Sequence, residues 1–263
     1  MAVSLAYDDT LSRVRLTAGG LPSAAVSVRV ERSTDQVRWT TVRGGAALLP
    51  SDLAVALDDW EFAPGRVNYY RVTSYASGGS QVGQQHGSMT PVIDRVWLKS
   101  VARPFLNQKV VVQDYGPVSR PARGGVFEVI GRTLPVAVQE VRGSREWTMT
   151  VLTDGEGEAH DLDLLLASGD ILLVQVPADC DVPGGYVTVG TAQAARPSRR
   201  SRRRLWDLPC TEVAAPGADV VGATVNYQSL QATYATYADQ LAAHATYGSL
   251  LELIGDPEDV IVP

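Results

Sequence analysis

The sequence predicts a mainly β protein with two β modules, one helix in the second module and a C-terminal segment of short helices. Three observations predict this fold class. Short runs that alternate apolar and polar side chains recur over residues 1–195. The 24 glycines and 15 prolines supply the turns that many short strands need. The length of 263 residues suits one large domain or two ordinary ones.

The first module is expected over residues 1–92, as a β-sandwich of six or seven short strands. Its clearest strands are expected at 14–17, 26–33, 39–42 and 67–75. The run VERSTD followed by Trp39, the acidic segment with Trp60 and the strand around Tyr70 resemble a fibronectin type III domain. That resemblance implies that Trp39, Trp60 and Tyr70 pack in the core of the module.

The second module is expected over residues 93–195, as a β-barrel or sandwich that carries one helix. Its strands are expected at 96–98, 109–113, 125–130, 136–141, 145–153, 171–176 and 185–189. Within 145–153, Trp147, Met149 and Val151 alternate with polar residues and should face one side. The helix is expected over Glu158–Ser168, where Leu162, Leu165 and Leu166 form one apolar face.

Residues 196–223 are expected to form a basic, extended bridge, because Pro209 and Pro216 prevent a helix. Three interpretations of its arginines stay open: a solvated loop, ion pairs with carboxylates of a neighbouring copy, and contact with nucleic acid. The candidate residues for a subunit interface are Arg199, Arg200, Arg202, Arg203, Arg204 and Trp206.

Residues 224–263 contain an internal repeat followed by an acidic tail. Tyr227, Tyr237 and Tyr247 are ten residues apart, and each follows a residue that suits a helix cap, such as Thr236. The repeat predicts short helices that place tyrosine and leucine on one side and dock on another surface. The candidate docking residues are Tyr227, Tyr237, Tyr247, Leu230, Leu241 and Leu251.

The charge is distributed unevenly along the chain. Residues 196–204 carry six arginines, whereas residues 205–263 carry eight acidic residues and no lysine or arginine. Opposite blocks of charge are typical of proteins that meet copies of themselves or fixed partners. General binding of nucleic acid is not expected, because the net charge of the chain is −6.

The residues with chemical reactivity are sparse and scattered. No G-x-S-x-G or phosphate-loop pattern occurs, and neither Cys180 nor Cys210 has a histidine nearby in sequence. The acidic doublets Asp8-Asp9 and Asp58-Asp59 are interpreted as solvated turn residues. We expect no catalytic residue, no metal site, no cofactor, no membrane span and no secretion signal of the Sec type.

Two segments carry a resemblance to a known family. They are VWLKSVARPFLNQKVVV with the following strands to PADCDVPGGYVTVG, and RRRLWDLPCTEVAAP with the tyrosine repeat. Both resemble minor tail proteins of long-tailed actinobacteriophages, most closely a distal tail protein. The resemblance covers residues 93–263.

This resemblance implies a structural virion protein of the tail tip or baseplate, made in the host cytoplasm. Its barrel would be a split β-barrel similar to the tail-tube fold, and its copies would form a hexameric or trimeric ring. The implied partners are the tail-tube protein, the tape-measure protein and other tail-tip proteins, while DNA passes without specific binding. The family implies no catalytic residues.

The alternative is a tail adhesin module that binds a receptor or carbohydrate, with a host surface glycan as partner. This alternative predicts that Trp60, Tyr69 and Tyr75 gather on one exposed, concave face. Assembly into a ring instead predicts that these aromatic residues are buried.

Overall fold

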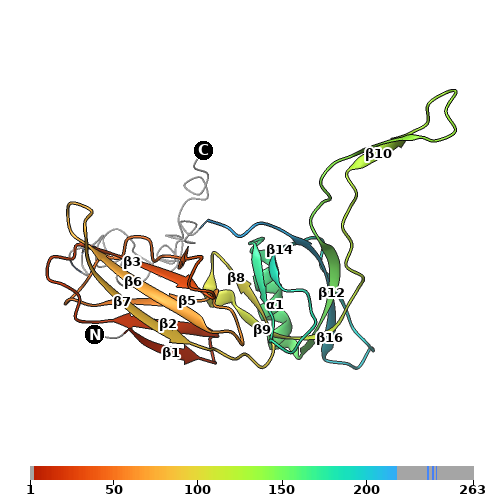
Figure 1. The fold of residues 1–263 in the computed structure, drawn as a ribbon. Coiled ribbons are helices and arrows are strands. Elements are labelled where there is room, and N and C mark those ends of the chain that lie inside the picture. The colour runs from red at the N-terminus through yellow and green to blue at the C-terminus, as the bar shows by residue number, and fades with distance from the viewer. Residues whose placement is uncertain (1–2, 218–235, 237–238, 240, 242–263) are drawn as a thin grey trace. The chain divides into compact units, whose positions relative to one another are not determined.

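The computed structural model describes residues 3–217, 236, 239 and 241. These residues are mainly β and include one α-helix and one short 3-10 helix, Pro104–Leu106. The chain divides into two compact units (Figure 1). Of the described residues, the first unit contains 3–93, 99–107, 216–217, 236, 239 and 241, and the second contains 94–98 and 108–215.

The first unit contains two antiparallel sheets. The three-stranded sheet has the order β1-β2-β5, with strands β1 (Ser4–Asp8), β2 (Arg13–Ala18) and β5 (Val55–Asp59). The four-stranded sheet has the order β4-β3-β6-β7, with strands β4 (Thr40–Thr41), β3 (Ser27–Ser33), β6 (Asn68–Tyr75) and β7 (Gln81–Met89). The four strands expected from the sequence in this region are therefore confirmed to within one or two residues.

Buried apolar side chains alternate along these strands and form the core of the unit. In β2, Val14, Leu16 and Ala18 are buried while the residues between them are not. In β6, Tyr70 and Val72 are buried in the same way. Alternation of this kind is what places one face of each sheet against the core.

The expectation that three aromatic residues fill this core is correct only for Tyr70. Trp39 is half-buried, and the Arg71 guanidinium lies 4.2 Å from its ring centroid. Trp60 is also half-buried, with the Arg13 guanidinium at 5.5 Å. Arginine side chains cover these two indole faces by cation–π contact, so the rings lie at the edge of the unit rather than inside it.

The second unit is built around a closed six-stranded barrel. Its order is β12-β9-β8-β13-β14-β16, and β16 pairs back with β12 to close the ring. The strands are β8 (Val96–Ser100), β9 (Gln108–Tyr115), β12 (Glu146–Asp154), β13 (Leu172–Gln175), β14 (Gly185–Val189) and β16 (Arg203–Glu212). A short strand, β15 (Gln193–Ala195), pairs with the beginning of β16.

Side chains fill the interior of the barrel. Trp147, Met149 and Val151 of β12 are buried on one side, as the sequence predicts, and Leu208 and Cys210 of β16 are buried as well. Small barrels normally have such packed interiors. A passage for DNA therefore cannot run through a single barrel of this kind.

Helix α1 (Glu156–Ala167) packs on β12 and β9. The predicted helix, Glu158–Ser168, is confirmed with a shift of one or two residues. Leu162 and Leu165 are buried and Leu166 is half-buried, so the predicted apolar face is correct. Gly169 follows the helix with a φ of 68°, a conformation that glycine adopts without strain at a helix end.

Part of the expected bridge is a barrel strand instead. Arg203–Glu212 forms β16, which pairs with β12 along its whole length. The edge of β16 opposite β12 pairs with β15 near Leu205 and with β14 from Cys210 onward. Pro209 falls where one partner gives way to the other, and its carbonyl accepts from Gly190 N at 2.8 Å. The missing proline N–H is therefore tolerated at this junction.

The strands expected at 125–130 and 136–141 lie outside the barrel. They form a separate two-stranded sheet of β10 (Gly124–Phe127) and β11 (Val136–Gln139). Their apolar composition suggested a place in the barrel, but the sheet is closed without them.

The C-terminal docking candidates lie mostly outside the described residues. This applies to Tyr227, Tyr237, Tyr247, Leu230 and Leu251. Leu241 is described, and its side chain is 53% exposed. Thr236 Oγ1 accepts from Asp239 N at 3.2 Å, and Asp239 Oδ2 accepts from Thr236 N at 3.1 Å. This reciprocal pair has the geometry of a helix capping box. Among the described residues, no helix has the length and apolar character to cross a membrane.

Candidate functional site

Four of the five arginines expected at a subunit interface are exposed on the second unit, and the fifth, Arg204, is half-buried. Arg199, Arg200 and Arg202 are exposed and form no ion pair with any described residue. Arg203 pairs with Asp154 of the same chain at 3.1 Å, at the end of the β12–β16 ladder. The first three arginines are therefore available to an outside carboxylate, whereas Arg203 already has one.

Trp206 does not lie at this surface. Its side chain is buried in the barrel, and its indole N–H donates to Thr153 Oγ1 at 3.1 Å. Because β16 alternates inward and outward, Trp206 shares the inner face with Leu208 and Cys210. Its role as an interface anchor is therefore not supported.

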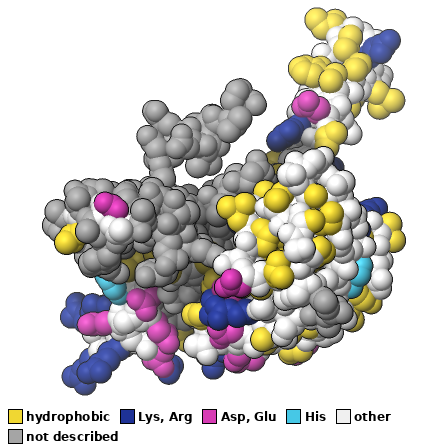
Figure 2. Space-filling view, turned by 90° about the vertical axis from the view of Figure 1, so that its left-hand side faces the viewer, with side chains coloured by type: hydrophobic (Ala, Val, Ile, Leu, Met, Phe, Trp, Pro, Cys, Tyr) yellow, Lys and Arg dark blue, Asp and Glu magenta, His cyan; other side chains and the backbone are white. Residues whose placement is uncertain are grey.

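A second surface, which the sequence reading did not anticipate, is the hairpin of residues 117–142, here called the arm. Every residue of the arm except Gly125 is exposed. Nine large apolar side chains in it are each at least 40% exposed: Val118, Val126, Phe127, Val129, Ile130, Leu134, Val136, Val138 and Val141. Figure 2 shows such side chains gathered on the projecting hairpin.

Hydrogen bonds join the arm to the barrel as a continuous ribbon. Beyond the β9–β12 pairing, Gly116 N donates to Thr148 O and Ser119 forms a bridge with Glu146. Gly143 N then donates to Pro121 O at 2.9 Å, and β10 pairs with β11 further out. The arm is therefore an extension of two barrel strands past the end of the barrel.

The register of the arm places apolar side chains together on one face. Phe127 lies opposite Val136, and Gly125 lies opposite Val138. Paired residues in an antiparallel ladder share a face, so Phe127, Val136 and Val138 are neighbours. A Cβ atom at Gly125 would lie 2.9 Å from the Phe127 ring, so the glycine leaves the space in which that ring lies.

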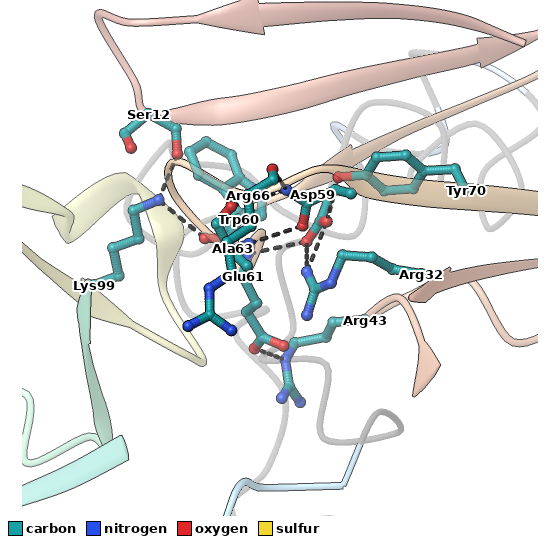
Figure 3. Close-up of polar contacts among 11 residues, drawn as sticks. Ser12, Arg32, Arg43, Asp59, Trp60, Glu61, Ala63, Arg66, Tyr70 and Lys99 are labelled. Carbon is teal, nitrogen blue, oxygen red and sulfur yellow. Dashed lines mark hydrogen bonds and ion pairs between the residues drawn. The ribbon is translucent and has the colours of Figure 1, made fainter. Parts of the chain in front are cut away.

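A third cluster is a buried polar network in the first unit, drawn in Figure 3. Lys99 is only 2% exposed, and its Nζ donates to Ser12 O at 2.5 Å and to Trp60 O at 2.9 Å. The same nitrogen lies 4.6 Å from the centroid of the Phe62 ring. Burial lowers the pKa of Lys99 to about 7, although the carboxylates of Asp59 and Glu61 oppose that shift.

The carboxylate of Asp59 is the centre of the network. Arg32 Nη1 donates to its two oxygens at 2.6 and 2.7 Å, Tyr70 Oη donates at 2.8 Å and Glu61 N donates at 2.9 Å. Burial raises the pKa of Tyr70, and the nearby Asp59 charge raises it further. The interpretation of Asp58-Asp59 as a solvated doublet is therefore wrong for Asp59, because a strand places it inside the unit.

The polar network holds the segment that follows β5. Asn68 Oδ1 accepts from Ala63 N at 2.8 Å, and its Nδ2 donates to Ala63 O and Arg66 O. Arg43 Nε donates to Glu61 at 2.7 Å. These contacts, with those of Lys99 and Asp59, tie residues 59–68 to β3, to β6, to Arg43 and to Lys99. The cluster therefore holds this segment in place.

The described residues show no arrangement for metal chemistry or for an exposed aromatic platform. No group of three His, Cys, Asp or Glu side chains in this part of the chain is placed to hold a metal ion. Cys210 is buried, and burial raises the pKa of its thiol to about 12, which disfavours the reactive thiolate. Trp60, Tyr69 and Tyr75 are each half-buried; Tyr69 and Tyr75 belong to β6, whereas Trp60 directly follows β5 of the other sheet.

The sequence held a signal for the arm that the reading as barrel strands hid. GVFEVI and VAVQEV are apolar on both faces and flanked by glycine and proline. A run of that kind fits a strand buried on both faces, or an exposed strand whose faces are buried when it binds another surface. The buried lysine had no such signal, because its acceptors are main-chain atoms.

No family model matches the sequence, and no curated protein matches it. A functional assignment therefore depends on the fold and on the three clusters described above.

Proposed function

We propose that this chain is a structural subunit of a bacteriophage tail tip. In this proposal it is a minor tail protein of the distal tail type, whose copies form a ring that joins the tail tube to the tip or host-recognition apparatus. The ring has six copies, or three. The proposal assigns no catalytic residue and no cofactor.

The observation that carries the proposal is the closed barrel with α1 on β12 and β9. A barrel with one helix, similar to the tail-tube fold, is what the sequence resemblance implies. The interior is filled by side chains such as Trp147 and Met149, so the channel for DNA lies between barrels and needs several copies.

The first unit supports the proposal by its strand order. Sheets ordered β1-β2-β5 and β4-β3-β6-β7 suit a β-sandwich of the fibronectin type III kind, as an outward module of the ring. In the same proposal, the C-terminal short helices of residues 224–263 dock on a neighbouring surface. Trp60, Tyr69 and Tyr75 are half-buried, which matches neither the exposed face that the adhesin alternative predicts nor the full burial that assembly into a ring predicts.

The test is the copy number of the full chain in solution. Native mass spectrometry and negative-stain electron microscopy should show a closed ring of six or three copies at micromolar concentration. A chain that stays monomeric at about 100 μM would overturn the proposal, since a ring interface of standard size gives tighter binding.

The exposed arginines provide a second readout. Replacing Arg199 and Arg200 with glutamate should weaken assembly, because these side chains have no partner among the described residues. A matched control is Arg38→Glu with Arg66→Glu, which makes the same change of charge at exposed positions of the first unit. Equal loss of assembly in both variants would show an effect of net charge alone.

A further inference from the structure

The arm is a two-stranded ribbon that exposes nine large apolar side chains. An isolated two-stranded hairpin is marginally stable at best. Soluble monomers rarely expose contiguous apolar patches larger than a few hundred Å², and such patches mark interaction surfaces. The arm gathers nine exposed apolar side chains on one hairpin, and the two outer edges of its strand pair have no partner strand among the described residues.

We propose that the arm docks on helix α1 of a second copy of this chain. Each copy then gives one arm and receives another, in a head-to-tail contact that closes into a ring. The inference rests on the proposed function in so far as copies assemble. It deepens that function by naming the two surfaces that meet.

Opposite charges favour this pair of surfaces. The arm carries four arginines and two glutamates, and α1 carries four acidic residues with no lysine or arginine. Arg123, Arg132 and Arg142 form no ion pair with any described residue. The same holds for Glu156, Asp161 and Asp163 of α1, and all these side chains are exposed. Complementary charges of this kind steer association and fix its register.

The outer face of α1 also offers apolar contact. Leu164 is 46% exposed, on the side of the helix away from the buried Leu162 and Leu165. Asp161 and Gly157 lie one and two turns before Leu164 on the same face. A Cβ atom at Gly157 would have no neighbour within 4 Å, so this part of the face has room for a side chain of the arm.

The topology directs the arm away from the helix of its own chain. The ribbon leaves the barrel at the Glu146 end of β12, and α1 follows the other end of that strand, at Asp154. From Val118 to the tip near Ile130, the arm extends roughly 40 Å at the usual rise of a strand. That length matches the diameter of a domain of about 110 residues, so the arm can reach across a neighbouring barrel.

The first test reverses the charges on each surface. Arg123→Glu with Arg132→Glu should lower the assembly constant by about tenfold or more, and so should Asp161→Arg with Asp163→Arg. Combining all four substitutions restores complementarity and should recover assembly to within about threefold of the wild type. Arg38→Glu with Arg66→Glu is the control for net charge. Circular dichroism of each variant checks that the fold is kept.

The second test does not depend on charge. In a Cys180→Ser background, a Phe127→Cys protein is mixed with a Leu164→Cys protein and treated with a short bismaleimide. Each molecule has one accessible thiol, since Cys210 is buried, so a crosslinked dimer can form only between copies. We expect a crosslinked dimer from this mixture and none when Val37→Cys, exposed on the first unit, replaces Leu164→Cys.

The outcomes separate the two proposals. A wild-type ring that neither charge reversal weakens and that gives no crosslink overturns the docking of the arm and leaves the proposed function standing. A crosslink and charge rescue in an open chain of copies support the docking and overturn the closed ring. A wild-type monomer at about 100 μM overturns both.

Discussion

Replacing Lys99 with methionine should remove a pH dependence from the stability of the first unit. Burial lowers the pKa of Lys99 from 10.5 to about 7. Below pH 7 the amine is charged in both the folded and the unfolded chain, and burial of the charge costs about 5 kcal/mol. Between pH 7 and 10.5 the folded form has lost its proton while the unfolded form keeps it, so stability rises with pH.

The magnitude over an accessible range follows from those two pKa values. From pH 7 to pH 9 the wild type should gain about 2 kcal/mol relative to Lys99→Met, whose side chain does not titrate. The assay is urea unfolding at both pH values, with hydrogen exchange of residues 3–93 to assign the transition to the first unit. Lys109→Met is the matched control, because this second lysine is exposed and pairs with Asp94 at 2.7 Å.

The variant also loses two donors, and this loss is independent of pH. The carbonyls of Ser12 and Trp60 would lose the hydrogen bonds from Lys99. Each carbonyl that no water reaches would then lower the free energy of unfolding by about 1–3 kcal/mol. The absolute stability of the variant is therefore not the measure. If the free energies of unfolding of wild type and Lys99→Met differ by the same amount at pH 7 and at pH 9, the Lys99 amine is not desolvated and the reasoning is refuted.

Three further predictions concern single side chains. Tyr70→Phe removes the hydroxyl that donates to buried Asp59, so the free energy of unfolding in urea should fall by about 1–3 kcal/mol. An unchanged free energy of unfolding would contradict a carboxylate that is shielded from water. Leu165→Ala leaves a cavity between α1 and the barrel, so thermal unfolding should show a free energy of unfolding lower by roughly 2–5 kcal/mol. Leu164 is exposed, so Leu164→Ala should lower it much less. Arg145 pairs with Glu212 at 2.6 Å near the surface and lowers the pKa of the Glu212 carboxyl. Arg145→Ala should therefore raise that pKa in an NMR titration, while the free energy of unfolding falls by less than about 1 kcal/mol. An unchanged Glu212 pKa would show that the pair does not form in solution.

Strand β7 shows why part of the fold was out of reach of the sequence pattern. Its sequence, QVGQQHGSM, is polar and contains two glycines, so it does not read as a strand. A Cβ atom at Gly83 would lie 2.8 Å from Pro22, and one at Gly87 would lie 3.1 Å from Val3. These glycines leave space for residues that are distant in sequence, and a local sequence pattern does not reveal such contacts. The apolar alternation of β12 and the leucine face of α1 were predictable because burial alone determines them.

Strand β16 shows a signal that one residue concealed. Trp206, Leu208 and Cys210 alternate with exposed residues, as in a half-buried strand. Pro209 favoured the interpretation as a bridge, since proline rarely lies inside a sheet. The proline is accepted because it lies between the part of β16 that pairs with β15 and the part that pairs with β14, and the local sequence does not show this junction.

The candidate site was predictable only where charge and exposure suffice. Exposed positions of Arg199 and Arg200 follow from an arginine-rich run, as the sequence suggested. The arm was missed because alternation of apolar residues describes a strand but not which sheet it joins. Lys99 was missed because a lysine between Leu98 and Ser100 gives no hint of partners in another part of the chain.

The acceptors of Lys99 are main-chain carbonyls, and this has a consequence for how the chain can vary. A carbonyl is present whatever amino acid occupies positions 12 and 60, so both can mutate without abolishing the contact. Position 99 has no such freedom, because only a long side chain that ends in a donor reaches both oxygens. Among related chains, positions 12 and 60 should therefore vary more than position 99, which should remain lysine.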